Sequence, residues 1–569
     1  MTRTYAARAV LLVSAAAAAL AASPALSQEE RDVIIVTAEK READIQDVPI
    51  SVTSVSAEQI QSWNLNSGTE IARATPNLLV SNLGNEDQPK FSMRGIATPD
   101  FDLNTTSPTG VFYDEVYVAS QFLGGPQLFD LARVEVLRGP QGTLYGKNTT
   151  GGAINFITQA PTHEHEGYLN VQAGDNAYFR ATGAVNFPLA DTLAMRVAFN
   201  ASSSDGYVKN HNPLGQDLSS IDNHAARLSL LFEPSSDFDA TLRVFTSRAH
   251  PTNIGTIDIG GNPDGTNAFG VNPRRDPVTN EPYDNSEGFY DRTDSEIVVE
   301  GDGATLSINK GLGDNFTLTS ISNYTEGFFL NRVDADGSAA PLLHIDFFAD
   351  TLEWSQDLRI ASNLDGPFNF IAGLYYGHDE VGIRTDWNFF AGGLLRNQTY
   401  DQERDSYAVY GDGTFDLSPS TQLFAGARWT QDEGEQFNYQ VLGAGAAEVP
   451  LQPPQTYDDS AVTGRIGVRH HFTDDVMGYV QYARGYRSSA FNGSSLFNPD
   501  DLNVSDPEEL DAYEVGLKTQ LMDNRLTLNS SVFFYEYRDQ QFINTVEIGN
   551  SQVVNAGASE IYGIEVEAY

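Results

Sequence analysis

The chain has 569 residues, of which 77 are acidic and 34 basic, so its formal net charge is −43 at pH 7. This charge excludes a nucleic-acid-binding protein, because a phosphate backbone requires a basic surface. Cysteine is absent, which excludes disulfides and thiolate metal sites. Aromatic residues make up 11% of the chain, as expected for a protein with an aromatic belt at a membrane interface.

The first 27 residues have the pattern of a secretory signal peptide. Arg3 and Arg8 precede an apolar run from 9 to 22, and residues 25–27 supply small side chains at the expected cleavage positions. The run is shorter than the roughly 20 residues that span a bilayer as a helix. We therefore predict that the protein is exported and that residues 1–27 are removed.

Residues 28–44 form a polar stub that contains a short β-branched run, consisting of Val33, Ile34, Ile35, Val36, Thr37 and Ala38. Such a run beside a flexible terminus can add as a strand to the sheet edge of another protein. It can equally be the first strand of the domain that follows. The pattern alone leaves both interpretations open.

Residues 45–162 have the pattern of a compact α/β domain. Strand-like runs at 47–52, 91–96 and 110–118 accompany a helix that begins at the polar cap Ser56 and a second short helix from 69 to 74.

The domain closes with residues 131–158, in which a turn rich in Gly and Pro joins two strands. A phosphate-binding loop has Ser or Thr after its Gly-Lys pair and another Gly five residues earlier. Here Asn148 follows Gly146-Lys147, and Gln141 stands where the earlier Gly is required. The spacing therefore excludes that motif.

From residue 163 to 569, strand-like runs follow one another, and many alternate apolar with small or polar residues. Leu193, Met195, Val197 and Phe199 are one example. Brief turns alternate with long polar loops near 204–222, 250–295, 327–350, 381–404, 432–459, 487–510 and 539–555. A soluble β-sandwich shares the period of two, but regular alternation of short turns and long loops is typical of an antiparallel outer-membrane barrel.

These segments together resemble the TonB-dependent outer-membrane receptors. Residues 131–158 are similar to the receptors' plug domain, residues 33–38 to their TonB box, and the motifs at 482–488 and 513–518 to their late barrel strands. The resemblance implies a membrane β-barrel of 22 antiparallel strands with an N-terminal α/β plug in its lumen. About 16 strand-like runs are present here. The last of them ends at Tyr569 as if in mid-barrel, so we expect a C-terminally incomplete sequence or a pseudogene product.

The resemblance also implies a latch between the plug and the barrel. Arg94 and Arg138 lie in the matching plug motifs, and Glu514 and Glu565 lie in the matching barrel motifs. Charge-assisted hydrogen bonds can hold a polar plug in a polar lumen and break when the plug is pulled. The alternative is that these are four unrelated surface charges.

The sequence contains no pattern typical of a catalytic site, so we expect neither an enzyme nor a cofactor. Residues 163–166, His-Glu-His-Glu, are the nearest approach to a metal-binding tract, but a solvated linker explains them as well. His344 is an isolated candidate for haem capture in a long loop.

By resemblance, the expected function is TonB-dependent active transport of a scarce ligand, in the first place a ferric siderophore. An oligosaccharide or a plant-derived organic nutrient is the alternative, and Trp387, Phe389, Phe390 and Tyr400 could stack on either. The implied partners are TonB of the inner membrane, an extracellular ligand and outer-membrane lipid.

Overall fold

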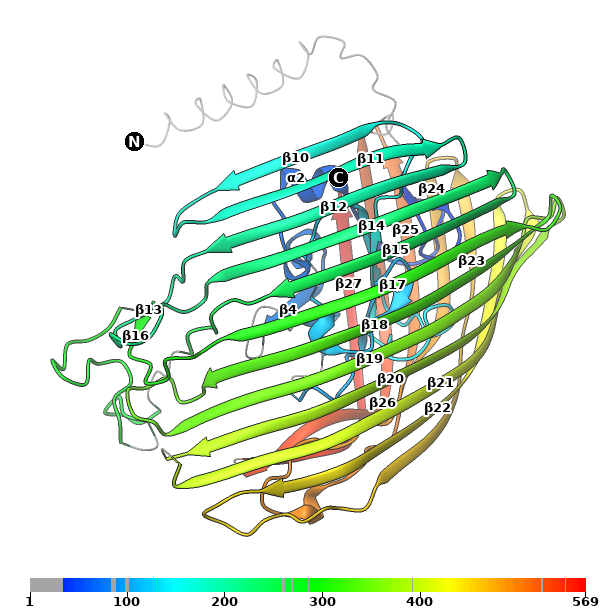
Figure 1. Cartoon of the computed structure of the whole chain (residues 1–569). Helices are drawn as coiled ribbons and strands as arrows, with labels where there is room; N and C mark the ends of the chain where they lie inside the picture. Colours follow the sequence, from blue (N-terminus) through cyan, green and yellow to red (C-terminus); the bar gives the residue numbers. More distant parts are fainter. Residues whose placement is uncertain are drawn as a thin grey trace, which may run out of the picture.

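The computed structural model describes residues 34–82, 89–97, 102–125, 127–256, 261–267, 270–284, 286–390, 392–522, 525–547 and 549–569. The predicted signal peptide, residues 1–27, and Val33 lie outside these ranges. A sheet of 16 antiparallel strands curls around a smaller domain, which occupies the space inside it (Figure 1).

The large sheet is a continuous meander in which each strand pairs with the next, from β10 at one edge to β27 at the other. This is the number of strands that the sequence predicts. Its strands are β10 (Glu166–Ala173), β11 (Phe179–Ala190), β12 (Leu193–Ser204), β14 (Ile221–Ser235), β15 (Phe238–Ala249), β17 (Ile297–Gly311), β18 (Phe316–Asp334), β19 (Leu343–Ser362), β20 (Phe368–Phe389), β21 (Leu394–Ser418), β22 (Thr421–Leu442), β23 (Gln455–Thr473), β24 (Val476–Arg487), β25 (Glu508–Leu521), β26 (Leu526–Glu547) and β27 (Asn550–Ala568). Connecting loops hold β13 (Lys209–Asn210), β16 (Glu287–Gly288) and the 3₁₀ helix η3 (Pro499–Asp501).

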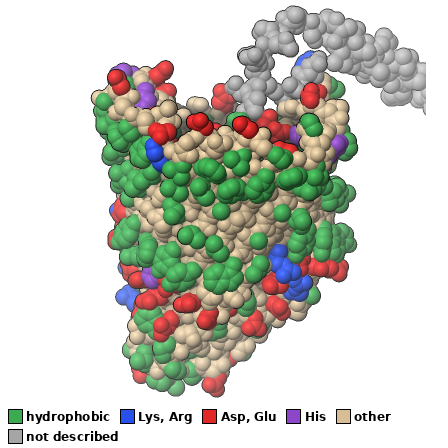
Figure 2. Space-filling view, turned by 90° about the vertical axis from the view of Figure 1, so that its right-hand side faces the viewer, with side chains coloured by type: hydrophobic (Ala, Val, Ile, Leu, Met, Phe, Trp, Pro, Cys, Tyr) green, Lys and Arg blue, Asp and Glu red, His purple; other side chains and the backbone are tan. Residues whose placement is uncertain are grey.

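The sheet is apolar on its outer face and polar on its inner face, which reverses the arrangement of a soluble protein. In β25, Val515 is 54% exposed, whereas the neighbouring Glu514 is 3% exposed. Figure 2 shows hydrophobic side chains over much of the outer wall, with acidic side chains gathered toward the upper and lower parts of the view. A wall of this kind matches the lipid-facing band of a membrane barrel. Within the described residues, no helix is both long and apolar enough to cross a bilayer.

Several of the predicted long loops are largely strand. β20 and β21 run through most of 381–404, and β18, β19, β26 and β27 cover most of 327–350 and 539–555. β21 has 25 residues, whereas about ten cross a bilayer. Beyond the lipid the outward face of a strand meets water, so polar residues take the outward positions while the hydrogen-bonded ladder continues.

The inner domain is the predicted α/β plug. Its main sheet has five strands in the order β3-β8-β9-β6-β7, with β6 and β9 parallel. Its elements are β1 (Ile35–Val36), β2 (Ala43–Asp44), β3 (Val52–Ser56), α2 (Ala57–Ser62), the 3₁₀ helix η1 (Gly68–Ala74), β4 (Leu78–Asn82), β5 (Pro89–Met93), β6 (Thr109–Tyr113), β7 (Val116–Tyr117), the 3₁₀ helix η2 (Gln121–Leu123), β8 (Leu131–Arg138) and β9 (Gly152–Thr158).

Local sequence explains most of these plug elements. Ser56 caps α2 as predicted, because its hydroxyl accepts from the Gln59 amide and the Gln59 side chain accepts from the Ser56 amide. The strand expected at 47–52 begins only at Val52, and the second helix is a 3₁₀ helix. Buried β-branched and aromatic side chains of β8 and β9 form the core of the plug. The five-stranded sheet carries Arg138 at the end of β8, whereas Arg94 follows β5 of the separate β4–β5 pair.

Candidate functional site

Arg94 lies in the turn that follows β5 and projects into the barrel wall. Its Nε and Nη2 donate to the two carboxylate oxygens of Glu565 at 2.9 and 2.6 Å, and its Nη1 donates to Glu514 at 2.6 Å. The guanidinium also lies 4.2 Å from the centre of the Phe533 ring. Arg94 has φ +52° and is followed by Gly95 at +80°, so a left-handed turn aims the side chain.

Arg138 ends β8 and contacts the same barrel strand. Its Nη1 and Nη2 donate to the two oxygens of Glu567 at 3.0 and 2.9 Å, whereas its Nε is 3.5 Å from Glu565. Glu567, absent from the sequence prediction, is thus the nearer partner of Arg138. Residues two apart on a strand share a face, so Glu565 could have indicated it.

The structure therefore brings all four predicted latch residues together, with Glu567 as a fifth member. The side chains of Arg94 and Arg138 are almost fully buried, as are those of their three carboxylate partners. Removing one partner of a buried ion pair costs about 3–5 kcal/mol, although the intact pair contributes little net stability. These ion pairs can hold the plug against the barrel wall, and the two surfaces can separate once the pairs are broken.

The Gly- and Pro-rich turn between β8 and β9 rests against β23 and β24, which adjoin the latch strands of the wall. The Thr463 hydroxyl donates to the Gly142 carbonyl at 2.8 Å, and the Asn148 amide donates to the Tyr486 carbonyl at 2.9 Å. A Cβ on Gly142 would lie 2.7 Å from the backbone of Arg484. The glycine allows a close approach of backbone to backbone, which a nucleotide site would not require.

The predicted TonB box is docked in this structure. Ile35 and Val36 pair with β2, and Val36 and Ala38 are buried in a plug cluster, whereas Ile34 and Ile35 are more than a third exposed. In this structure the segment is a short first strand of the plug, and its addition to the sheet edge of another protein stays a prediction.

Glu135 holds the docked segment from the middle of β8. Its Oε1 accepts from the Thr37 amide at 2.7 Å and from the Thr37 hydroxyl at 3.2 Å, and it pairs with Arg133 at 2.7 Å. Burial raises the pKa of Glu135, while Arg133 and the Thr37 hydrogen bonds oppose that rise. Glu135 is therefore a buried carboxylate within the plug that ties the segment at residues 34–38 to β8.

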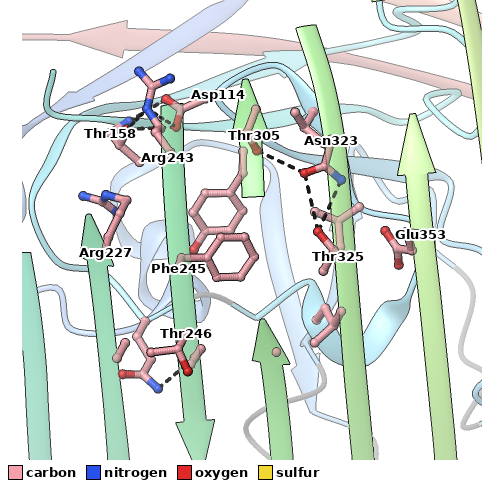
Figure 3. A pocket seen from close by; sticks show the side chains of 18 of the residues that line it. Asp114, Thr158, Arg227, Arg243, Phe245, Thr246, Thr305, Asn323, Thr325 and Glu353 are labelled. Carbon is pink, nitrogen blue, oxygen red and sulfur yellow. Dashed lines mark hydrogen bonds and ion pairs between the residues drawn. The ribbon is translucent and has the colours of Figure 1, made fainter. Parts of the chain in front are cut away.

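A cavity of about 130 Å³ separates the plug from the wall on the side of β14 to β19. Figure 3 shows Arg243 reaching Asp114 and Thr158 at one end, with Phe245 projecting into the middle. Arg243 is 3.3 Å from Asp114 and donates to the Thr158 hydroxyl at 3.0 Å. The latch contacts lie on β25 to β27, so the cavity and the latch belong to different parts of the wall.

The other predicted residues are dispersed. Trp387, Phe389 and Tyr400 are buried in an apolar cluster above the plug, together with Leu103 of the plug, and Phe390 is 50% exposed. His163 pairs with Glu233 at 2.8 Å near the start of the barrel. Most of the aromatic residues thus fill space between plug and wall.

Comparison with known families agrees with this geometry. Residues 235–569 match the model described as TonB dependent receptor-like, beta-barrel, and residues 44–153 match the TonB-dependent receptor plug domain. Together these two models leave unmatched mainly the N-terminus and the first strands of the barrel.

The chain is similar to known receptors over most of its length. The pesticin receptor of Yersinia enterocolitica is 26% identical over 557 residues, which are 95% of this chain and 76% of the relative. The ferripyoverdine receptor of Pseudomonas aeruginosa is 21% identical over 93% of this chain and 63% of the relative. The crystal structure of the ferric yersiniabactin uptake receptor FyuA from Yersinia pestis superposes with a TM-score of 0.77 at 22% identity, covering 91% of this chain and 76% of that one. The predicted barrel with an internal plug is confirmed.

Proposed function

Because the chain belongs to the TonB-dependent receptors, a family of bacterial outer-membrane transport proteins, we propose that it imports a ferric siderophore by active transport. The relatives named above are receptors for pesticin, ferripyoverdine and ferric yersiniabactin. These names favour a ferric chelate over an oligosaccharide or a plant-derived nutrient. We assign the chain a transport role and no catalytic one.

The observation that carries the proposal is the plug inside the barrel, fastened by buried ion pairs. Two plug arginines contact three barrel carboxylates, and the plug sheet occupies the space that a passive pore would leave open (Figure 1). A ligand can pass only when the plug rearranges, which requires work from outside the receptor.

In our proposal TonB supplies that work through the segment Val33 to Ala38. Ile34 and Ile35 are exposed and accessible to a partner strand. Pulling this segment would withdraw Thr37 from Glu135 and so disturb β8, which ends at Arg138. The latch of Arg94, Arg138, Glu514 and Glu565 would then open from the plug side.

We further propose the following division of the chain: a signal peptide at 1–27, the TonB-binding stub at 28–44, the plug at 45–162 and the barrel at 163–569. The cavity beside β14 to β19 supports a route for the ligand along that wall, where ion pairs such as that of Arg243 with Asp114 would have to separate.

Two measurements test the proposal. Deleting residues 34–38 should abolish uptake of the ferric chelate while leaving its binding to whole cells intact. Unchanged uptake would indicate a passive pore. Expression should also rise under iron limitation, and expression indifferent to iron would favour the organic nutrient.

A further inference from the structure

Among the described residues, one group of side chains away from the plug has the makings of a metal site. It consists of Asp291, Asp334 and His344, from each of which one oxygen or nitrogen atom lies within 4.8 Å of the other two. Asp291 Oδ1 and His344 Nε2 are 2.8 Å apart. The three residues come from three separate segments, which the fold brings together.

Asp334 gives this group its chemical character. Its side chain is buried, with 4% of the residue exposed. Oδ1 accepts from the Gly337 amide at 3.1 Å, but Oδ2 is buried without a hydrogen-bond partner among the described residues. Leaving an ionised carboxylate oxygen buried and unpaired is costly unless the group takes up a proton or a cation neutralises it. The group therefore offers Asp334 Oδ2, which has no hydrogen-bond partner among the described residues, beside the ligand atoms of Asp291 and His344.

The surrounding charges leave this group available to a cation. Arg292 follows Asp291 in the chain, and it is already engaged by Asp294 at 2.9 Å and by Asp346 at 2.6 Å. Asp336 adds a further negative charge, and its oxygens accept from the Ser338 hydroxyl and the Leu343 amide. Acidic side chains therefore outnumber basic ones among these residues.

The strand register places the group outside the barrel lumen. Asp334 and His344 face each other across β18 and β19, one position beyond the pair Val333 and Ile345. Because Ile345 and Val333 pack in the cluster inside the barrel, Asp334 and His344 point to the opposite face of the sheet. Asp291 reaches His344 from the loop between β16 and β17, and β16 lies with β13 at one end of the barrel (Figure 1).

We propose that Asp291, Asp334 and His344 bind one divalent first-row transition-metal ion that ties the loop before β17 to the β18–β19 hairpin. Ligand atoms around a tetrahedral Zn²⁺ lie about 3.3 Å apart, given bonds of about 2.0–2.2 Å. The present separations, from 2.8 Å up to 4.8 Å, reach that value with small side-chain adjustments.

The donor set selects the class of metal. An imidazole nitrogen with two carboxylates suits Zn²⁺, whereas Ca²⁺ and Mg²⁺ prefer oxygen ligands alone. Because the site lies on the face away from the lumen, the ion is a resident clip for the outer loops and is separate from the transported iron. The proposal does not depend on the identity of the cargo.

The test measures Zn²⁺ binding to the full-length protein in detergent, after removal of bound metal with a chelator. We expect one high-affinity Zn²⁺ by calorimetry, and a weaker response to Ca²⁺. Asp334→Asn and His344→Gln should each weaken binding by at least about 100-fold, the upper end of the loss seen for residues that only support a ligand. Co²⁺ in the same site should give the visible absorption bands of a nitrogen- and oxygen-ligated ion.

His378 provides the matched control. It too lies 3.0 Å from each of two carboxylates, Glu380 and Asp405, but these contact opposite ring nitrogens and cannot converge on one ion. His378→Gln should therefore leave Zn²⁺ affinity unchanged. Heat-modifiable migration on a gel confirms that each variant is folded. Equal Zn²⁺ affinity in folded wild-type, Asp334→Asn and His344→Gln proteins would overturn the proposal, as would tighter binding of Ca²⁺ than of Zn²⁺.

Discussion

Replacing Arg138 by Gln should loosen the plug far more than the loss of an exposed ion pair would. Arg138 donates to both oxygens of Glu567 at 3.0 and 2.9 Å, and its Nε lies 3.5 Å from Glu565. Arg138→Gln therefore leaves two buried carboxylates facing a neutral side chain. Glu567→Gln removes the other partner, and the double variant removes both charges.

The expected magnitude follows from burial and geometry. Two unit charges about 4 Å apart attract by about 4 kcal/mol at an effective dielectric constant of about 20. Each single variant should cost about 3–5 kcal/mol in plug stability, because it strands a buried charge. The double variant should cost much less than their sum, so we expect a coupling energy of about 2–4 kcal/mol.

The absence of cysteine provides the assay. A single Ala153→Cys substitution, buried in β9, should react with a maleimide only when the plug opens, and its labelling across a urea series yields the free energy of opening. The control cycle uses Arg248 and Asp302, which are 2.7 Å apart but 32% and 54% exposed, and should give at most about 1 kcal/mol. A coupling between Arg138 and Glu567 no larger than in this control would refute the reasoning.

Two further predictions concern the plug. Glu135→Ala removes the acceptor that holds residues 34–38, so it should cost about 1–3 kcal/mol and raise maleimide labelling of Ala38→Cys by about 5- to 100-fold; unchanged labelling would contradict this role. Gly139→Ala should destabilise the plug by about 2–4 kcal/mol, because φ is +85° and the new Cβ would lie 2.7 Å from a barrel tyrosine hydroxyl. Gly95→Ala, at φ +80° with open space around it, should cost only about 1–2 kcal/mol. Equal urea midpoints for Gly139→Ala and Gly95→Ala would count against a packed latch.

The sequence pattern predicts the barrel because alternation within each single strand is enough to reveal it. Alternation such as that of Leu193 to Phe199 follows from one lipid-facing and one lumen-facing side of a strand. The α2 cap at Ser56 is equally local. The ends of β20 and β21 resemble a loop, because polar residues such as Arg384 and Asp386 take the outward positions there. The inward residues, such as Ile383 and Trp387, stay apolar and buried.

The contacts within the site could not be predicted from the sequence, because they depend on how the fold brings distant segments together. Motif resemblance identifies Arg94, Arg138, Glu514 and Glu565, but the pairing of Arg138 with Glu567 depends on how the plug is rotated in the lumen. Thr37 and Glu135 are 98 residues apart, and no short-range pattern connects them. The grouping of Asp334 with His344 likewise depends on a strand register that the sequence does not reveal.

The central claim is that this receptor moves a ferric chelate only when TonB drives it. The most direct measurement is accumulation of radiolabelled ferric siderophore by cells that produce the protein, with and without TonB. We expect accumulation that requires TonB, with surface binding alone in its absence. Equal accumulation in both strains would contradict it.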